Sequence, residues 1–208
     1  MPEVVLASNN AKKLAELRRI LEPLVPGIEV LGLGDFPPYD EPAETEPTFE
    51  GNALIKARAC LAATGLPSLA DDSGLCVDEL NGMPGVLSAR WSGVSKADGG
   101  DAANNALLLS QLGDVPDERR TARFVCAMAF CTPDGTEVVE LGEMRGRILR
   151  AEQGEGGFGY DPLFAADGYD VSTAELSAEE KDRISHRGKA LTLIAPVVVE
   201  ALSSQGRG

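Results

Sequence analysis

Apolar and polar positions in the first 35 residues follow two periods in turn, one typical of strands and one typical of helices. The run EVVLAS (3–8) is apolar and rich in valine, which predicts a buried strand. Leucine and isoleucine then recur at helical spacing as far as Leu24, and Asn9 or Asn10 is a suitable N-cap for this helix. A second strand is predicted at 28–33.

The same order of strands and helices continues along the chain. Residues 33–47 are rich in proline and acidic side chains, which predicts a long loop. Thr48 is a suitable cap for a helix that ends at Gly65, and PSLADD (67–72) follows as a strand that ends on two aspartates. Alternating strands and helices predict an α/β fold with a mixed sheet.

The second half of the chain combines β-rich runs with glycine-rich loops. NGMPGVLSARWSG (81–93) predicts irregular structure, and DAANNALLLSQLGD (101–114) predicts a helix. Two β-rich runs, 122–132 and 137–150, are joined by PDGT, which predicts a hairpin. GEGGFGYDPLF (154–164) is predicted to be a loop and 177–202 to form one or two closing helices.

Composition limits the classes of protein to consider. A chain of 208 residues predicts one domain or two small lobes, and the net charge of −14 argues against binding duplex nucleic acid. None of the four cysteines forms a CxxC pair, so we expect free core thiols in a cytoplasmic protein. We expect neither a signal peptide nor a membrane span, because no sufficiently long apolar run occurs.

Three polar segments follow predicted strands, where ligands bind in sheets of this class. SNNAKK (8–13) joins a helix N-terminus to Lys12 and Lys13, which suits a phosphate, although two surface lysines would give the same pattern. DDSG (71–74) predicts a positive partner for its carboxylates and suits Mg²⁺, although a simple turn is the alternative. GFGYDP (157–162) suits either a stacking surface or a packed turn.

Five segments taken together resemble one family. LASNNAKKLAEL, TFEGNALIKARA, LADDSGLCVDELNGMPGVLSARWSG, GGFGYDPLF and AELSAEEKDRISHRGKAL occur in this order over nearly the whole chain. The set resembles the inosine triphosphatase-like family of noncanonical purine nucleoside-triphosphate pyrophosphatases. The resemblance implies a single two-lobed domain over 1–208, with an elongated mixed sheet flanked by helices around a central nucleotide-binding cleft.

The resemblance also implies an activity. Such a protein hydrolyses dITP, ITP, XTP or dXTP to the monophosphate and pyrophosphate with Mg²⁺ as cofactor, and it is commonly a cytoplasmic homodimer. An exposed apolar run around Trp91 suits such a dimer. Two alternatives stay open: a nucleotide-binding sensor without turnover, and a pyrophosphatase of different base specificity.

The resemblance assigns roles to particular residues. Asp72 would be the catalytic base and a metal ligand, with Glu44 and Asp71 as further metal ligands. Glu46 or Glu41 is an alternative to Glu44, because the acidic loop aligns loosely. The residues implied in substrate binding are Ser8, Asn9, Asn10, Ala11, Lys12, Lys13, Lys56, Ser73, Phe158, Gly159, Tyr160, Asp161, Lys181, His186 and Arg187. Many members have Thr-Gly-Asn where this chain has Ser8-Asn9-Asn10.

Overall fold

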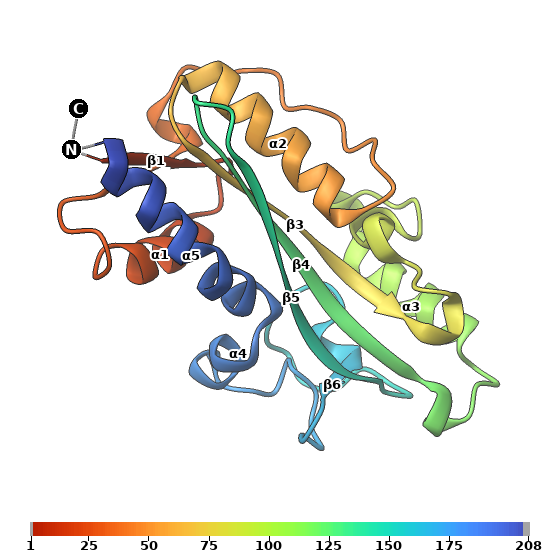
Figure 1. Ribbon diagram of the computed structural model, residues 1–208. Helices are drawn as coiled ribbons and strands as arrows, with labels where there is room; N and C mark the ends of the chain where they lie inside the picture. Colours follow the sequence, from red (N-terminus) through yellow and green to blue (C-terminus); the bar gives the residue numbers. More distant parts are fainter. Residues whose placement is uncertain (1, 206–208) are drawn as a thin grey trace. The chain divides into compact units, whose positions relative to one another are not determined.

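Six strands form one sheet in the order β2–β1–β3–β4–β5–β6 (Figure 1). The structure is a computed structural model and describes residues 2–205. The strands are β1 (Glu3–Leu6), β2 (Glu29–Gly32), β3 (Ser68–Val77), β4 (Thr121–Cys131), β5 (Glu137–Ile148) and β6 (Phe164–Ala166). β1 pairs in parallel with β2 and β3, whereas β5 and β6 are antiparallel, so the predicted mixed α/β sheet is confirmed.

The chain divides into two compact units. Unit 1 contains the chain up to Asp72, residues Cys126–Gly142 and the chain from Lys189 onward, and unit 2 contains Ser73–Val125 and Glu143–Gly188. The single domain over 1–208 with a central cleft stays a prediction. Residues 1 and 206–208 of that predicted domain lie outside the described residues.

Unit 1 is built around an apolar core between its strands and two helices. Helices α1 (Ala11–Leu21) and α5 (His186–Gln205) contribute Leu17, Leu21, Leu191 and Ile194 to this core. α2 (Phe49–Thr64) lies on the opposite side of the strands in Figure 1 and buries small residues such as Ala53 and Ala57. Small buried residues allow this helix to approach the sheet closely, which matters for the side chains it presents there.

The ends of α1 and α2 follow local signals in the sequence. The Asn10 side chain caps α1, and the Thr48 hydroxyl accepts a hydrogen bond from the Gly51 N–H at 3.1 Å. α2 ends at Gly65, whose φ of +73° is accessible to glycine at little cost. These three predicted helix boundaries are confirmed.

Unit 2 has its own core beneath α3 (Gly100–Gln111). Leu108 of α3 packs with Leu75, Phe124 and Phe164 from three strands. Residues Gly85–Arg90 form a 3₁₀ helix where irregular structure was predicted, and this prediction was wrong. The Ser88 hydroxyl explains the difference, because it accepts from the Leu75 N–H at 2.9 Å and donates to the Gly85 carbonyl at 2.6 Å.

β3 corrects another prediction from the sequence. The strand was expected to end at Asp72, but it continues to Val77. Pairing with β1 reaches only as far as Leu6 opposite Leu69, whereas β4 is the neighbour on the other side of β3. The two aspartates therefore lie within their own strand and just beyond the carboxyl end of β1.

Two expectations from composition can be compared with the structure. The four cysteines are free and buried, as predicted for core thiols. Within residues 2–205, no helix is long and apolar enough to cross a membrane. The cytoplasmic location and the homodimer stay predictions. Trp91, which belongs to the apolar run expected to suit a dimer, is half-buried, and its indole N–H donates to Gln111 Oε1 at 3.0 Å.

Gly146 provides a test of how unit 2 closes its sheet. It pairs with Ala166 across β5 and β6, and a Cβ at this position would clash with the Ala165 carbonyl oxygen and lie 2.8 Å from Phe164 Cζ. We expect Gly146→Ala to lower the free energy of unfolding by about 1–3 kcal/mol in urea denaturation, because β6 must move away. Gly34→Ala is the control, since a Cβ added at Gly34 would have no neighbouring atom within 4 Å. Equal stability of the two variants would contradict the close packing at Gly146.

Candidate active site

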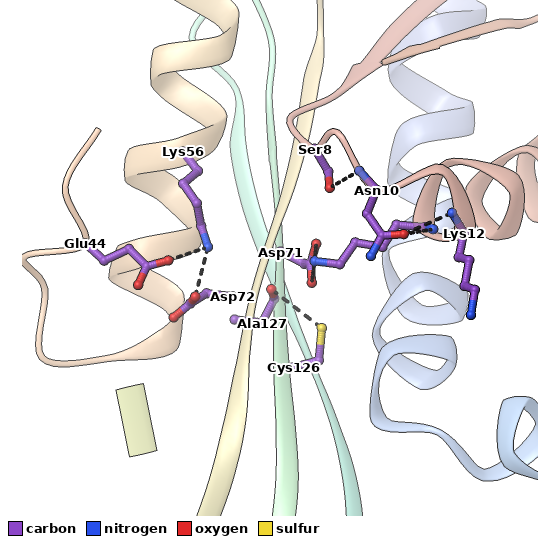
Figure 2. A network of polar contacts seen from close by, with 10 residues as sticks. Ser8, Asn10, Lys12, Glu44, Lys56, Asp71, Asp72, Cys126 and Ala127 are labelled. Atoms are coloured by element: carbon purple, nitrogen blue, oxygen red, sulfur yellow. Dashed lines mark hydrogen bonds and ion pairs between the residues drawn. The ribbon is translucent and has the colours of Figure 1, made fainter. Parts of the chain in front are cut away.

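Asp71 and Asp72 are consecutive in β3 and therefore point to opposite faces of the strand. Lys13 Nζ lies 2.8 Å from each carboxylate oxygen of Asp71, and Lys56 Nζ lies 2.8 Å from Asp72 Oδ1. Figure 2 shows Asp72 on the side of Glu44 and Lys56, and Asp71 on the side of Ser8 and Asn10. The predicted positive partner thus exists as two lysines, one for each carboxylate.

The Asp72 side joins three charged groups. Lys56, from α2, also donates to Glu44 Oε1 at 3.1 Å, so one ammonium group links two carboxylates. The Asp72 side chain is only 10% exposed. Burial raises the pKa of Asp72, and the hydrogen bond from Lys56 offsets only part of this effect. Burial alone would lower the pKa of Lys56, but the hydrogen bonds and charges of the two carboxylates together raise it.

Asn52 holds the acidic loop against α2. Its Oδ1 accepts from the Glu46 N–H at 3.0 Å and its Nδ2 donates to the Glu46 carbonyl at 3.2 Å, while a further hydrogen bond joins Asn52 to Asp72. Gly51 makes this approach possible, because a Cβ there would lie 2.5 Å from Glu46 Cβ. The fixed loop brings Glu44 to Lys56, which favours Glu44 among the three candidate acids.

Asn52 was missed by sequence reasoning. It is fully buried, although asparagine is usually exposed. An amide on the apolar side of a predicted helix, in FEGNALIKA, is the signal that points to it. A buried amide needs hydrogen-bond partners, and here the backbone of Glu46 and the carboxylate of Asp72 provide them.

The Asp71 side is built on the N-terminus of α1. Asn10 Oδ1 accepts from the N–H groups of Lys12 and Lys13 at 3.0 and 3.4 Å, and Ser8 Oγ accepts from the Asn10 N–H at 3.1 Å. The predicted Asn10 cap thus supplies a partner for two N–H groups of the helix N-terminus that was expected to suit a phosphate. A lysine in the first turn opposes the helix dipole, and the bond to Asp71 compensates for it at Lys13.

The charges and donor atoms around Asp72 fit a divalent metal ion. Glu44 and Asp72 both reach the position of one ammonium group, and Mg²⁺ usually takes one or two protein carboxylates together with phosphate and water oxygens. Among residues 2–205, however, no three acidic, histidine or cysteine side chains form a ready metal cluster. Asp71 contacts Lys13 on the other face, so the arrangement does not support Asp71 as a third ligand.

The GFGYDP loop of unit 2 exposes its phenylalanine ring and buries its tyrosine and aspartate. Phe158 is 67% exposed, whereas Tyr160 is 5% exposed and its hydroxyl donates to the Ser88 carbonyl at 2.9 Å. Asp161 is also buried, and its carboxylate accepts from the Phe158 N–H, from Thr173 Oγ1 and from Lys181 Nζ. Phe158 is therefore the ring available for stacking, and Tyr160 and Asp161 anchor the loop.

The closing helices contain the remaining predicted residues. Lys181 lies in α4 (Ala178–Ile184), and its Nζ is 5.2 Å from the centre of the Phe158 ring. A continuous helix would place Lys181 and His186 about 140° apart, so the sequence predicts a break around Ser185 if both serve one ligand. This break is confirmed, since Ser185 has φ −61° and ψ 143° and α5 begins at His186. The His186 ring stacks on Phe124 with centroids 5.1 Å apart, and Arg187 next to it is half-buried.

Four further predicted residues lie at the start of α1 and in β3. Asn9, Ala11 and Lys12 are exposed at the start of α1. Ser73 follows Asp72 in β3 and is half-buried. The substrate roles of these residues stay predictions.

Comparison with known proteins assigns the chain to a family. The model of the Ham1 family matches residues 4–197. The chain belongs to the Ham1 family. A dITP/XTP pyrophosphatase of Nocardia farcinica is 63% identical over 199 residues, which is 95% of each chain.

Solved structures of the Ham1 family have the same fold. A nucleoside-triphosphatase, dITP/XTP pyrophosphatase, from Mycobacterium abscessus superposes with a TM-score of 0.81 at 56% identity, covering 94% of this chain and 99% of that one. A HAM1 protein from Coxiella burnetii gives a TM-score of 0.85 at 40% identity, covering 96% and 100%. The resemblance inferred from five motifs is thereby confirmed for this Ham1-family chain.

The buried ion pair of Lys13 and Asp71 can be compared with an exposed one. Its side chains are 23% and 3% exposed, whereas those of Arg58 and Glu137 are 54% and 38% exposed. We expect double-mutant cycles in urea denaturation to give a coupling energy of about 1.5–3 kcal/mol for Lys13–Asp71 and about 0.2–1 kcal/mol for Arg58–Glu137.

Salt should separate the same two pairs. Only the exposed pair should weaken strongly between low and high ionic strength, because buried charges are screened less. Equal coupling energies with equal salt dependence would contradict a special role for the contact with Asp71.

Proposed function

We propose that this Ham1-family chain hydrolyses noncanonical purine nucleoside triphosphates, dITP, ITP, XTP or dXTP, to the monophosphate and pyrophosphate. Relatives that share up to 63% identity over 95% of the chain and are named dITP/XTP pyrophosphatases support this function. Within the molecule, the observation that carries the proposal is the buried Asp72 carboxylate, linked through Lys56 to Glu44.

Asp72 acts as the base in the proposed reaction. A water oxygen forms a bond to the α-phosphorus, its proton passes to an Asp72 carboxylate oxygen, and the bond between the α-phosphorus and the bridging oxygen breaks. Pyrophosphate leaves and the nucleoside monophosphate remains. Asp72 need not be a strong base, because transfers of this kind rest mainly on positioning and charge stabilisation.

Glu44 and Asp72 are the residues that would hold Mg²⁺. When bound, Mg²⁺ neutralises negative charge on phosphate oxygens and so lowers the cost of the charge that develops during transfer. Lys56, which contacts both carboxylates, keeps them in place and adds a positive charge for the phosphates.

Lys13 and the turn before it are the proposed phosphate contacts on the Asp71 side. The Lys13 side chain is 23% exposed, and Asp71 fixes the position of its ammonium group. We assign Asp71 to positioning Lys13. Ser8 and Asn10 shape the turn through their hydrogen bonds, which fixes the course of the backbone at the start of α1.

Base recognition is assigned to residues of unit 2. Phe158 offers an exposed aromatic face for stacking, and Lys181, His186 and Arg187 supply hydrogen-bond donors. Inosine and xanthine carry an oxygen at C6, which accepts from such donors, whereas adenine presents an amino group there. A site built on hydrogen bonds of this kind discriminates by about 10⁴–10⁵ between partners that fit and those that leave polar groups unpaired.

A product assay tests the proposed reaction. Incubation of the purified chain with ITP and Mg²⁺ should release pyrophosphate and IMP in equal amounts, at a rate far above that with ATP. Addition of EDTA should abolish turnover, and excess Mg²⁺ should restore it, because phosphate charge is then neutralised again.

Other outcomes of this assay identify the alternatives. Orthophosphate as the first product would contradict attack at the α-phosphorus. Tight binding of ITP without any product would favour a sensor, and faster turnover of modified pyrimidine nucleotides would favour a different base specificity.

A further inference from the structure

Two side chains of α3 hold the backbone of Gly159 from both sides. The Gly159 N–H donates to Asp101 Oδ2 at 3.1 Å, and Asn105 Nδ2 donates to the Gly159 carbonyl at 3.2 Å. Asp101 and Asn105 are four residues apart on the helix and therefore share one face. We call this pair of hydrogen bonds the Gly159 clamp.

The clamp acts on the residue next to the exposed ring. Gly159 follows Phe158 directly and has φ +60°, a left-handed backbone conformation that residues other than glycine rarely adopt. The Phe158 N–H is fixed separately by Asp161 Oδ2 at 2.8 Å, and Lys181 pairs with the same carboxylate. Hydrogen bonds from both sides thus fix the backbone that carries the Phe158 ring.

Asn105 would lower the free energy of unfolding if its side chain served packing alone. It is 4% exposed, and its Oδ1 has no hydrogen-bond partner among residues 2–205. A buried acceptor without a partner costs free energy, whereas an apolar residue of similar size would fill the same space. The bond from Nδ2 to the Gly159 carbonyl is the contact that an apolar residue could not provide.

We infer that Asp101 and Asn105 are positioning residues for purine recognition, because they fix the loop that presents Phe158 and Lys181 to the base. This inference rests on the proposed function. The two residues act through Gly159 and do not themselves contact substrate. Without the clamp, the loop samples more conformations, and binding of the base must then pay for ordering it.

The test separates the base from the phosphates. IMP carries the base and one phosphate, and pyrophosphate carries phosphates alone. We expect Asp101→Ala and Asn105→Ala each to weaken IMP binding in calorimetry about tenfold and to raise KM for ITP by a similar factor. The inhibition constant of pyrophosphate should stay within about twofold of the parent value, because the phosphate contacts belong to other residues.

Two further variants serve as controls. Asp101→Asn keeps an oxygen that accepts from the Gly159 N–H and should restore most of the IMP affinity. Asn104→Ala removes another buried amide of α3, whose bonds go to the Ser92 N–H at 2.7 Å and the Ser88 carbonyl at 3.3 Å. It should lower Tm but leave IMP affinity within about twofold.

Several results would overturn the inference. Parental IMP affinity and KM in both alanine variants, with only a lower Tm, would mean that the clamp supports folding alone. Equal losses for IMP and pyrophosphate would indicate general damage. If Asn105→Ala does not fold, the comparison of Asp101→Ala with Asp101→Asn decides, because Asp101 is only half-buried.

The proposed function and the inference fail in different ways. If the parent chain releases pyrophosphate from ITP and the variants behave like the parent, only the inference about the Gly159 clamp is refuted. If the parent chain neither binds IMP nor hydrolyses ITP, both the proposed function and the inference are refuted.

Discussion

Two adjacent carboxylates in a buried part of β3 require two positive partners, and the structure of unit 1 depends on this requirement. The side chains of Asp71 and Asp72 are 3% and 10% exposed, so each ionised group would be costly alone. Because the strand points them to opposite faces, one cation cannot serve both. α1 supplies Lys13 on one face and α2 supplies Lys56 on the other.

This requirement explains features that local propensity opposes. Lys13 lies in the first turn of α1, where a positive charge is unfavourable, and its contact with Asp71 compensates for this cost. The carboxylates in turn lie beyond the end of β1, where pairing on that side of β3 stops.

Loops in both units are held through their backbone by buried polar side chains of helices. Asn52 bonds to both the N–H and the carbonyl of Glu46, and Asp101 and Asn105 together do the same for Gly159. Holding the backbone fixes where the side chains of the two loops lie: Glu44 bonds to Lys56, and Phe158 is exposed. Rigid helices thus fix the conformation of irregular segments that would otherwise be less ordered.

Local features of the sequence predicted the local parts of this structure. The caps at Asn10, Thr48 and Gly65 and the break at Ser185 each depend on a few neighbouring residues, and all were predicted correctly. The end of β3 was not, because it depends on β4, which comes more than forty residues later. Nor were Asn52, Asp101 and Asn105 identified as site residues. The amide of Asn52 on the apolar side of a predicted helix is a sequence signal, but the loop backbones that these three side chains hold carry none; Gly159 is 58 residues from Asp101.

The central claim is that the two aspartates have different tasks, with the chemistry on the Asp72 side and lysine positioning on the Asp71 side. Asp71→Asn and Asp72→Asn, compared in one experiment of Mg²⁺ calorimetry and ITP turnover, test it most directly. We expect Asp72→Asn to lower kcat by about 10²–10⁴-fold and to lose measurable Mg²⁺ binding in the presence of substrate analogue. Asp71→Asn should keep Mg²⁺ affinity within about threefold and mainly raise KM, because Lys13 loses its fixed position. Equal losses of Mg²⁺ affinity in both variants, or parental turnover in Asp72→Asn, would contradict it.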